Sequence, residues 1–287
     1  PPLSYVCDDA RRQGGLVIWC HNGQGMEAPV AAALGKLDAM NLFDPYWNDI
    51  EYALWYRPLN CGIRLPASTG SDWFVCSANR VYSQTGGEFR YEPWLQGVRE
   101  GRTFITNGPA IFMTVNGAEP GQTVQAKPGD SVEVTVSWSS HYAVESVEIV
   151  SGGVVAARRT FPASPLPPGE GAGEGRGKAK ARRSSQTSGR ITARVPVGSS
   201  GWVAARLGST VRDSFAQPIW AHTSPVYIEA GNDPGPARRE SARWFAETID
   251  RSMEWVSAKG RFYTDAQRRE VLDLFCQGQE VYRRMTG

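Results

Sequence analysis

The pattern of apolar residues changes near residue 105, and this change limits the folds that the chain can adopt. Before it, short apolar runs alternate with helical patterns, which predicts an α/β region built on a parallel sheet or part of a barrel. After it, seven short stretches of strand character are separated by Gly- and Pro-containing turns, which predicts an antiparallel β-sandwich. These stretches are 110–115, 131–139, 144–150, 154–160, 190–195, 202–207 and 224–229.

The α/β region is expected over residues 1–107. Ser4 is a candidate N-cap for its first helix, and Gly14 is a candidate stop for the same helix. Residues 106–109 predict a linker turn that leads into the sandwich. The expected helices are 4–13, 27–34, 47–59 and 93–100, and the expected strands are 16–20, 37–42 and 63–66.

The sandwich is expected over residues 108–231. Its clearest strand alternates apolar and polar residues, which puts Val132, Val134, Val136 and Trp138 on one face. An alternation with a period of two is typical of a strand with one buried face. This strand therefore predicts one wall of the sandwich core.

A segment rich in Pro, Gly, Ser and basic residues, 164–189, interrupts the sandwich. It has almost no apolar side chains, so burial cannot offset the entropy lost on ordering it. Its basic residues would also suit a polyanion-binding loop. The composition favours a disordered insert between two strands.

The C-terminal residues, 232–287, predict two helices that pack on the rest of the protein. Thr264 and Gln267 form a capping-box pattern at the start of the second helix. In the first helix, apolar residues recur at helical spacing and predict one buried stripe. The stripe consists of Ala242, Phe245, Ile249, Met253 and Val256.

Composition excludes several classes of protein. The 287 residues carry a formal net charge of +2, which gives no indication of a nucleic-acid-binding face. Five cysteines without a CxxC pair argue against a zinc knuckle or a disulfide framework, and we expect buried or half-buried thiols. No apolar run is long enough for a membrane span. The compartment stays open, because a signal peptide upstream of Pro1 would direct secretion or export to a periplasm.

Two polar residues follow the expected buried strands of the α/β region. His21 ends the run Gly14-Gly15-Leu16-Val17-Ile18-Trp19-Cys20-His21, and Asp72 ends the turn Thr69-Gly70-Ser71-Asp72. Loops after strand C-termini carry the chemistry of many α/β folds, and imidazole and carboxylate groups are good ligands for divalent metals. On spacing alone, a structural histidine and a turn-forming aspartate are favoured over a metal site.

An ordered set of short segments spans most of the chain outside the 164–189 insert. The segments are Trp19-Cys20-His21, Gly35-Lys36-Leu37-Asp38-Ala39-Met40-Asn41, Leu59-Asn60-Cys61-Gly62-Ile63-Arg64-Leu65-Pro66, Gly70-Ser71-Asp72, Asn79-Arg80-Val81-Tyr82, Gly101-Arg102-Thr103-Phe104-Ile105-Thr106-Asn107-Gly108-Pro109 and Ala221-His222-Thr223-Ser224-Pro225-Val226-Tyr227. This set resembles the CehA/McbA family of metallohydrolases, in the superfamily of polymerase and histidinol phosphatase (PHP) domains.

The resemblance implies a distorted PHP-like β/α barrel followed by an immunoglobulin-like β-sandwich. It also implies divalent metal ions, zinc or manganese, at the strand C-termini. A metal-activated water would hydrolyse a phosphoester, ester or carbamate-like bond of a small-molecule substrate. By this resemblance His21 and Asp72 match metal ligands. Near the barrel mouth, Asn22, Asn79 and Arg80 are candidate substrate contacts, although an ion pair is an equal alternative for Arg80.

The chain departs from the family pattern in two ways. The early His-x-His motif has no counterpart here, and Phe74 stands where the second ligand of an Asp-x-His motif would fall. We therefore expect the C-terminal part of a barrel whose upstream part is missing, with an incomplete metal site that binds no metal or binds it weakly and is inactive alone. The alternative is a degenerate barrel scaffold whose sandwich binds a glycan or a protein. Whether the chain is an enzyme stays open at this point.

Overall fold

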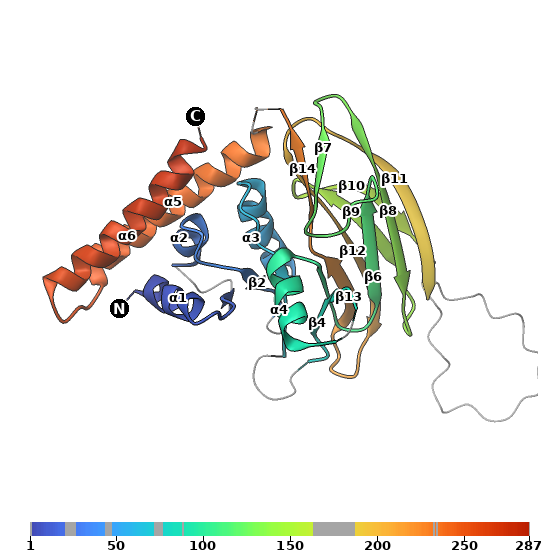
Figure 1. The fold of residues 1–287 in the computed structure, drawn as a ribbon, viewed down its shortest axis with the longest axis horizontal. Helices are drawn as coiled ribbons and strands as arrows, with labels where there is room; N and C mark the ends of the chain where they lie inside the picture. Colours follow the sequence, from blue (N-terminus) through green and yellow to red (C-terminus); the bar gives the residue numbers. More distant parts are fainter. Residues whose placement is uncertain are drawn as a thin grey trace, which may run out of the picture.

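The computed structural model describes residues 2–20, 27–43, 48–71, 77–87, 89–162, 187–231, 233 and 235–286, with only the backbone of 48–50. This part of the chain is a mixed α/β structure with six helices and three sheets (Figure 1). The helices are α1 (Leu3–Arg12), α2 (Ala28–Ala33), α3 (Asn48–Asn60), α4 (Tyr91–Glu100), α5 (Gly235–Lys259) and α6 (Asp265–Arg284). None of them is both long enough and apolar enough to cross a membrane.

A small parallel sheet holds the first three strands, β1 (Ile18–Trp19), β2 (Ala39–Asn41) and β3 (Ala67–Ser68). Helices α2 and α3 connect them, as the alternating pattern predicted. The register aligns Ile18 with Ala39 and Met40 with Ala67, so the three strands end at the same edge. In the described residues this sheet stays open and does not close into a barrel.

The third of these strands was predicted at 63–66, but it begins only at Ala67. Pro66 has no N–H and offers the sheet only its carbonyl, which accepts a hydrogen bond from the Met40 N–H at 2.9 Å. Helix α3 ends at Asn60, and the turn that follows it extends to Ile63, whose N–H donates to the Pro58 carbonyl. The apolar run therefore starts earlier than the strand.

The largest sheet has eight strands in the described residues. Its order is β10-β9-β12-β13-β5-β4, and β14 pairs with both β12 and β7. The pair β14–β7 is parallel, so the β-rich region is not purely antiparallel as predicted. The strands are β4 (Arg80–Ser83), β5 (Thr103–Thr106), β7 (Thr123–Ala126), β9 (Ser146–Ser151), β10 (Val154–Thr160), β12 (Gly201–Arg212), β13 (Pro218–Thr223) and β14 (Val226–Ala230).

Two strands of this sheet come from the first part of the chain. β5 pairs with β13 through Ala221 and Thr106, and β4 pairs with β5. The sheet therefore crosses the boundary expected at residue 107, and Thr106 ends a strand instead of starting a linker turn. The sequence patterns did not predict β4, β5, β7 or β13.

The third sheet contains β11 (Ser188–Pro196), β8 (Ser131–Ser139) and β6 (Ala110–Val115), in that order. It faces the large sheet across an apolar core that includes Trp138, Ile149 and Val203. Val132, Val134 and Val136 are fully buried in this core, which confirms the alternation. Ser188 and Gly189, expected in the disordered insert, pair with β8. Residues 164–186 of that insert lie outside the described residues.

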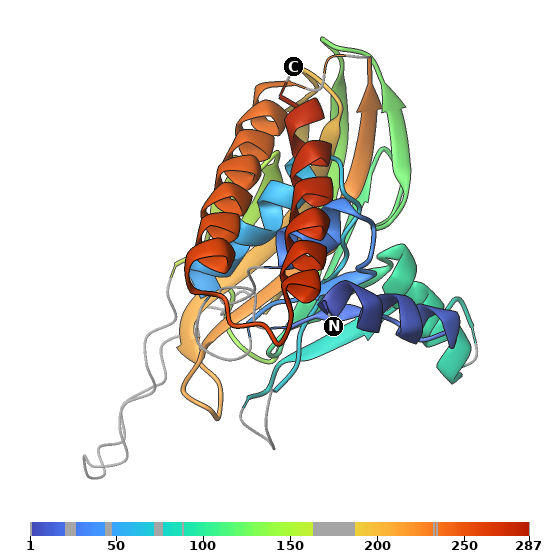
Figure 2. The same ribbon diagram turned by 90° about the vertical axis from the view of Figure 1, so that its left-hand side faces the viewer.

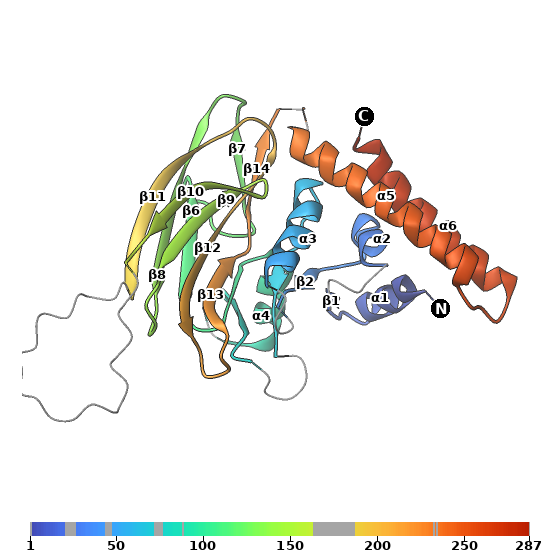
Figure 3. The same ribbon diagram turned by 180° about the vertical axis from the view of Figure 1, so that it is seen from behind.

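The two C-terminal helices lie where the sequence predicted helices, and they form a hairpin over the α/β region. Figure 2 shows α5 and α6 side by side, and Figure 3 shows α3 between this hairpin and the large sheet. The Thr264 side chain caps α6 by accepting a hydrogen bond from the Gln267 N–H at 3.2 Å. Helix α6 approaches α2 closely at Gly278, where an added Cβ would lie 2.9 Å from Val30.

The cap expected for the first helix is absent. Ser4 lies inside α1, which starts after Pro2. The Ser4 backbone N–H and hydroxyl both donate to the carboxylate of Glu27, at 2.9 and 3.1 Å. Glu27 immediately precedes α2, so Ser4 joins two helices and does not cap its own.

Candidate functional site

The carboxyl edge of the small parallel sheet is the candidate site. Cys20 follows β1 there, Phe43 follows β2, and the segment from Thr69 to Ser71 follows β3. The predicted ligands His21 and Asp72, the candidate contact Asn22 and Phe74 lie outside the described residues. Their described chain neighbours Cys20 and Ser71 both leave the sheet at this edge.

Phe43 is held in an unfavourable backbone conformation at this edge. Its φ is +64°, in the left-handed region that side-chain-bearing residues avoid. Its N–H donates to the buried carboxylate of Glu51 in α3, and its carbonyl accepts from the Asn79 side chain at 2.7 Å. The ring packs against Tyr52 and Trp220, with centroids 4.9 and 4.5 Å away. Contacts on every side therefore fix this residue, as is typical of strain at functional positions.

Asn79 joins the ends of two strands. Its side chain is almost fully buried, and its amide nitrogen bonds to Phe43 after β2. Its backbone N–H donates to the Ser77 hydroxyl at 3.3 Å. Its amide oxygen Oδ1 has no hydrogen-bond partner among the described residues, although it is shielded from solvent. An unpartnered buried acceptor is uncommon and marks a position able to receive a donor.

Arg80 turns back onto its own segment. One guanidinium nitrogen donates to the carbonyls of Asn79 and Ser77, at 2.6 and 3.5 Å. The residue is exposed, and within the described part of the chain it forms no ion pair. Its suitability for an anionic substrate stays a prediction.

Side chains that sequence reasoning did not single out connect the loops at this edge. The Thr69 hydroxyl donates to the Leu42 carbonyl, which ties the segment after β3 to the segment after β2. Ser77 donates to the Gly70 carbonyl at 3.5 Å. Thr69 belongs to the turn that ends in Asp72, so its position after a strand could have identified it. Glu51 lies inside α3, and no local sequence pattern marks it as a site residue.

A buried histidine lies behind the carboxyl edge, in a cluster of aromatic rings. His222 is fully buried, and its ring centroid lies 5.1 Å from those of Tyr52 and Trp55. Nδ1 lies 2.7 Å from the Thr223 carbonyl, so Nδ1 carries the hydrogen. Nε2 is then the acceptor for the Tyr56 hydroxyl at 2.6 Å. Burial lowers the pKa of His222 to about 3, so the ring is neutral.

The described residues contain no group of three or more His, Cys, Asp or Glu side chains that could hold a metal ion. Four of the cysteines lie in the described part of the chain. Cys7 and Cys61 are buried as expected, but Cys20 and Cys276 are exposed, which corrects the prediction. Cys20 is exposed where it leaves β1, and Cys276 is exposed on α6, 3.6 Å from the sulfur of Met253 in α5.

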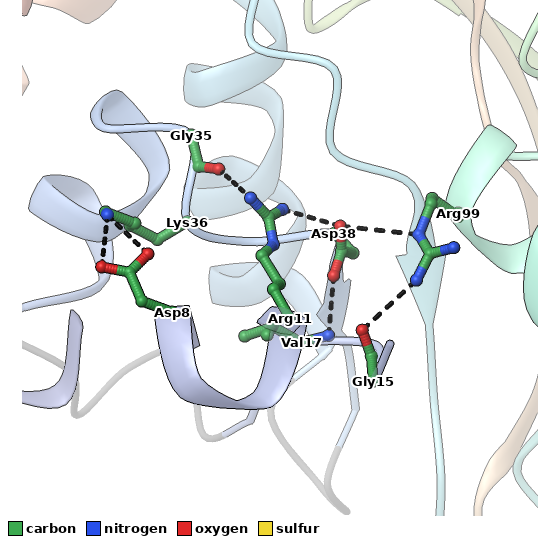
Figure 4. A network of polar contacts seen from close by, with 8 residues as sticks. All are labelled: Asp8, Arg11, Gly15, Val17, Gly35, Lys36, Asp38 and Arg99. Atoms are coloured by element: carbon green, nitrogen blue, oxygen red, sulfur yellow. Dashed lines mark hydrogen bonds and ion pairs between the residues drawn. The ribbon is translucent and has the colours of Figure 1, made fainter. Parts of the chain in front are cut away.

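The opposite, amino edge of the same sheet contains a network of charges (Figure 4). Asp38 precedes β2, and its carboxylate accepts a hydrogen bond from the Val17 N–H at 2.8 Å. Arg11 from α1 lies 2.7 Å from this carboxylate, and Arg99 from α4 lies 3.9 Å from it. Both arginines also donate to backbone carbonyls. The network fixes two helices to the strand starts.

Neither protein-family models nor curated proteins match this chain when compared with it.

Proposed function

We propose that this chain is part of a metal-dependent hydrolase that acts on a phosphoester, ester or carbamate-like bond. The proposed metal ligands are His21 and Asp72. One observation carries the proposal: Cys20 and Ser71, the residues that precede these two, leave the parallel sheet at one edge. Carboxyl edges of parallel strands are where α/β enzymes hold their reactive groups.

The donor types fit a divalent metal ion, but they form only part of a site. An imidazole nitrogen and a carboxylate oxygen both bind zinc or manganese, and a catalytic site needs about three protein ligands with one open position. A bound metal would supply a water with a lowered pKa. Further ligands would have to come from outside the described residues, which contain no complete set.

The described residues would shape the edge where the proposed metal ligands lie, but would not themselves take part in hydrolysis. Glu51 and Asn79 fix the backbone of Phe43, so the chain has one defined conformation where it leaves β2. The unpartnered Oδ1 of Asn79 supplies an acceptor at the same edge, able to orient a ligand or a substrate. The neutral His222 donates to a backbone carbonyl and accepts from Tyr56, so it is not available as a metal ligand.

Metal titration of the purified chain tests the proposal. We expect weak binding of Mn²⁺ or Zn²⁺ in calorimetry, and we expect His21→Ala and Asp72→Asn each to weaken it about tenfold or more. His141→Ala is the matched control, because His141 is exposed in the β-rich region and should not alter binding. Equal affinity in the wild type and in both ligand variants would refute the proposed site.

A hydrolysis screen tests the expectation of an incomplete site separately. With nitrophenyl phosphodiesters, esters and carbamates as substrates and added Mn²⁺ or Zn²⁺, we expect little or no turnover by this chain alone. Turnover that disappears in His21→Ala would support the hydrolase and contradict the incomplete site. Turnover that survives in His21→Ala would contradict the assignment of His21.

A further inference from the structure

Strand β6 is a terminal strand with no protection against additional pairing. It ends the β11-β8-β6 sheet, and its sequence Ala-Ile-Phe-Met-Thr-Val contains no charge and no proline. Its register with β8 is regular over six residue pairs. Two other terminal strands carry such features: β10 has Arg158, Arg159 and a register shift, and β11 has two arginines. Exposed strand edges without such features invite a further strand.

The hydrogen-bond pattern shows which backbone groups β6 leaves free. The Asn116 N–H donates to the Glu133 carbonyl, so alternate residues of β6 bond to β8. Ile111, Met113 and Val115 then direct their N–H and C=O groups away from β8. Val115 bonds through both groups to Ala118, at 2.8 and 2.9 Å. In the described part of the chain, the corresponding groups of Ile111 and Met113 have no partner.

A cavity of about 520 Å³ runs along this edge. Seven consecutive residues, 108–114, line it, so it follows the strand's edge and not one face of the strand. Residues 82–84 and 102–104 of the large sheet form the opposite wall. Ile111 and Met113 belong to the apolar core between the two sheets and are only 1% and 3% exposed, so little water reaches their unpartnered backbone groups.

Aromatic rings form the walls and the mouth of this cavity. Tyr82 and Phe104 stack with centroids 4.9 Å apart, and Phe112 meets Phe104 edge-on at 5.6 Å. Tyr82 and Phe112 are 53% and 56% exposed, which is high for large apolar rings. Such rings at a concave site are typical of ligand contacts.

The charges at the rim are unbalanced. Arg102 lies 3.0 Å from the Glu100 carboxylate, which neutralises it. Glu119 also lines the cavity, is exposed, and has no ion pair within the described residues. The rim therefore presents one uncompensated negative charge, close to the end of β6 that leads into the turn after Val115.

We propose that this β6 groove, lined by Ala110–Thr114, Tyr82, Phe104 and Glu119, binds an extended segment of another polypeptide as an added strand. The segment would bond to the backbone of Ile111 and Met113 and place alternate apolar side chains between the aromatic walls. A Lys or Arg of the segment would lie near Glu119. The β6 strand of a second copy fits less well, because it is already paired with its own β8. Residues 82–84 and 102–104 form the far wall of the groove and leave no room for that second sheet.

A displayed library of random 12-residue peptides, selected on the immobilised full chain, tests the proposal. We expect enrichment of sequences with apolar residues at every second position and a basic residue at one end. For an enriched synthetic peptide, N-methylation of the backbone amides on one edge should weaken binding about tenfold, because it removes hydrogen bonds and leaves the side chains in place. Methylation on the other edge is the control.

Two protein variants locate the contact. Thr114→Lys puts a charge on the outer face of β6 and should weaken binding about tenfold, whereas Val154→Lys on the 71% exposed position of β10 should not. Glu119→Gln should weaken only peptides with the basic residue, about threefold. Thermal unfolding of each variant checks that it folds.

Three results would overturn the proposal. One is a library without enrichment, or with enrichment of sequences that lack the alternation. Another is binding that survives both the N-methylation and Thr114→Lys. The third is concentration-dependent dimerisation in ultracentrifugation that Thr114→Lys abolishes, which would assign the groove to a second copy.

Discussion

The two edges of the β1–β2–β3 sheet are built by different means. At the amino edge, the Asp38 carboxylate meets two arginines and a backbone N–H, so a buried charge is matched by opposite charges. At the carboxyl edge, Phe43 keeps a left-handed conformation, and the Asn79 amide oxygen has no partner among the described residues. One edge satisfies its polar groups, and the other keeps strain and an unused acceptor.

This difference indicates where the molecule tolerates a cost in stability. Buried charges are stable only when paired, and the amino edge follows that rule. Strained backbone persists only where neighbours enforce it, and Glu51, Asn79 and an aromatic cluster enforce it at the carboxyl edge. The comparison therefore predicts different responses when each edge is perturbed.

The largest expected effect is acid destabilisation of the cluster behind the carboxyl edge. The folded-state pKa of His222 is lowered to about 3, below its ordinary value of 6.5, because burial disfavours the charged ring. The unfolded chain therefore binds a proton that the folded chain does not. The contribution of His222 to the free energy of unfolding is fully present above pH 6.5. About 4 kcal/mol of it is lost as the pH falls toward 3.

Urea unfolding at a series of pH values between 7 and 3.5 measures this effect. The slope of the unfolding free energy against pH should be shallower in His222→Gln than in the wild type. The difference should correspond to at most one proton less taken up on unfolding. His141→Gln, which changes an exposed histidine, should keep the wild-type slope. Identical slopes in all three proteins would show that His222 does not titrate as burial requires.

The next effect is the loss of the amino-edge carboxylate. Asp38→Ala leaves Arg11 and the Val17 N–H without their partner at a largely buried position, and we expect about 3 kcal/mol of destabilisation in urea unfolding. Asp9→Ala removes an exposed ion pair with Arg12 and should cost about 0.5 kcal/mol or less. A cost below about 1 kcal/mol for Asp38→Ala would remove the contrast between the two edges.

The smallest effect concerns the strained turn itself. Asn79→Ala removes the hydrogen bond to the Phe43 carbonyl, and we expect about 1–2 kcal/mol of destabilisation. Gln96→Ala is the matched amide control, because Gln96 bonds to Glu100 on the exposed surface of α4. A neutral Asn79→Ala would mean that Glu51 and the aromatic rings alone hold Phe43.

The regular parts of the fold could be predicted because they have local signals. The alternation through Val134 predicted β8, and Thr264 with Gln267 predicted the start of α6. Strand β13 could not be found in this way, because Ile219 through Thr223 are all buried and show no alternation. Fully buried strands lose the period of two.

The candidate site was predicted only as a position along the chain. Parallel strands bring Cys20 and Ser71 to one edge, and the residues that follow them, His21 and Asp72, are for that reason the proposed metal ligands. The contacts of Glu51 and Asn79 with Phe43 join segments that only the folded chain brings together. The left-handed backbone at Phe43 could not be predicted from the sequence, because such positions are usually occupied by glycine or asparagine.

The pairing of β5 with β13 has a consequence for how the protein unfolds. This pairing places Thr106 opposite Ala221, so the residues up to Thr106 contribute part of the sheet that the later strands complete. A chain cut near residue 107 would leave β13 with a bare edge and would leave β5 without its partner β13. The α/β region and the β-rich region should therefore unfold in one cooperative step, in the manner of a single folding unit.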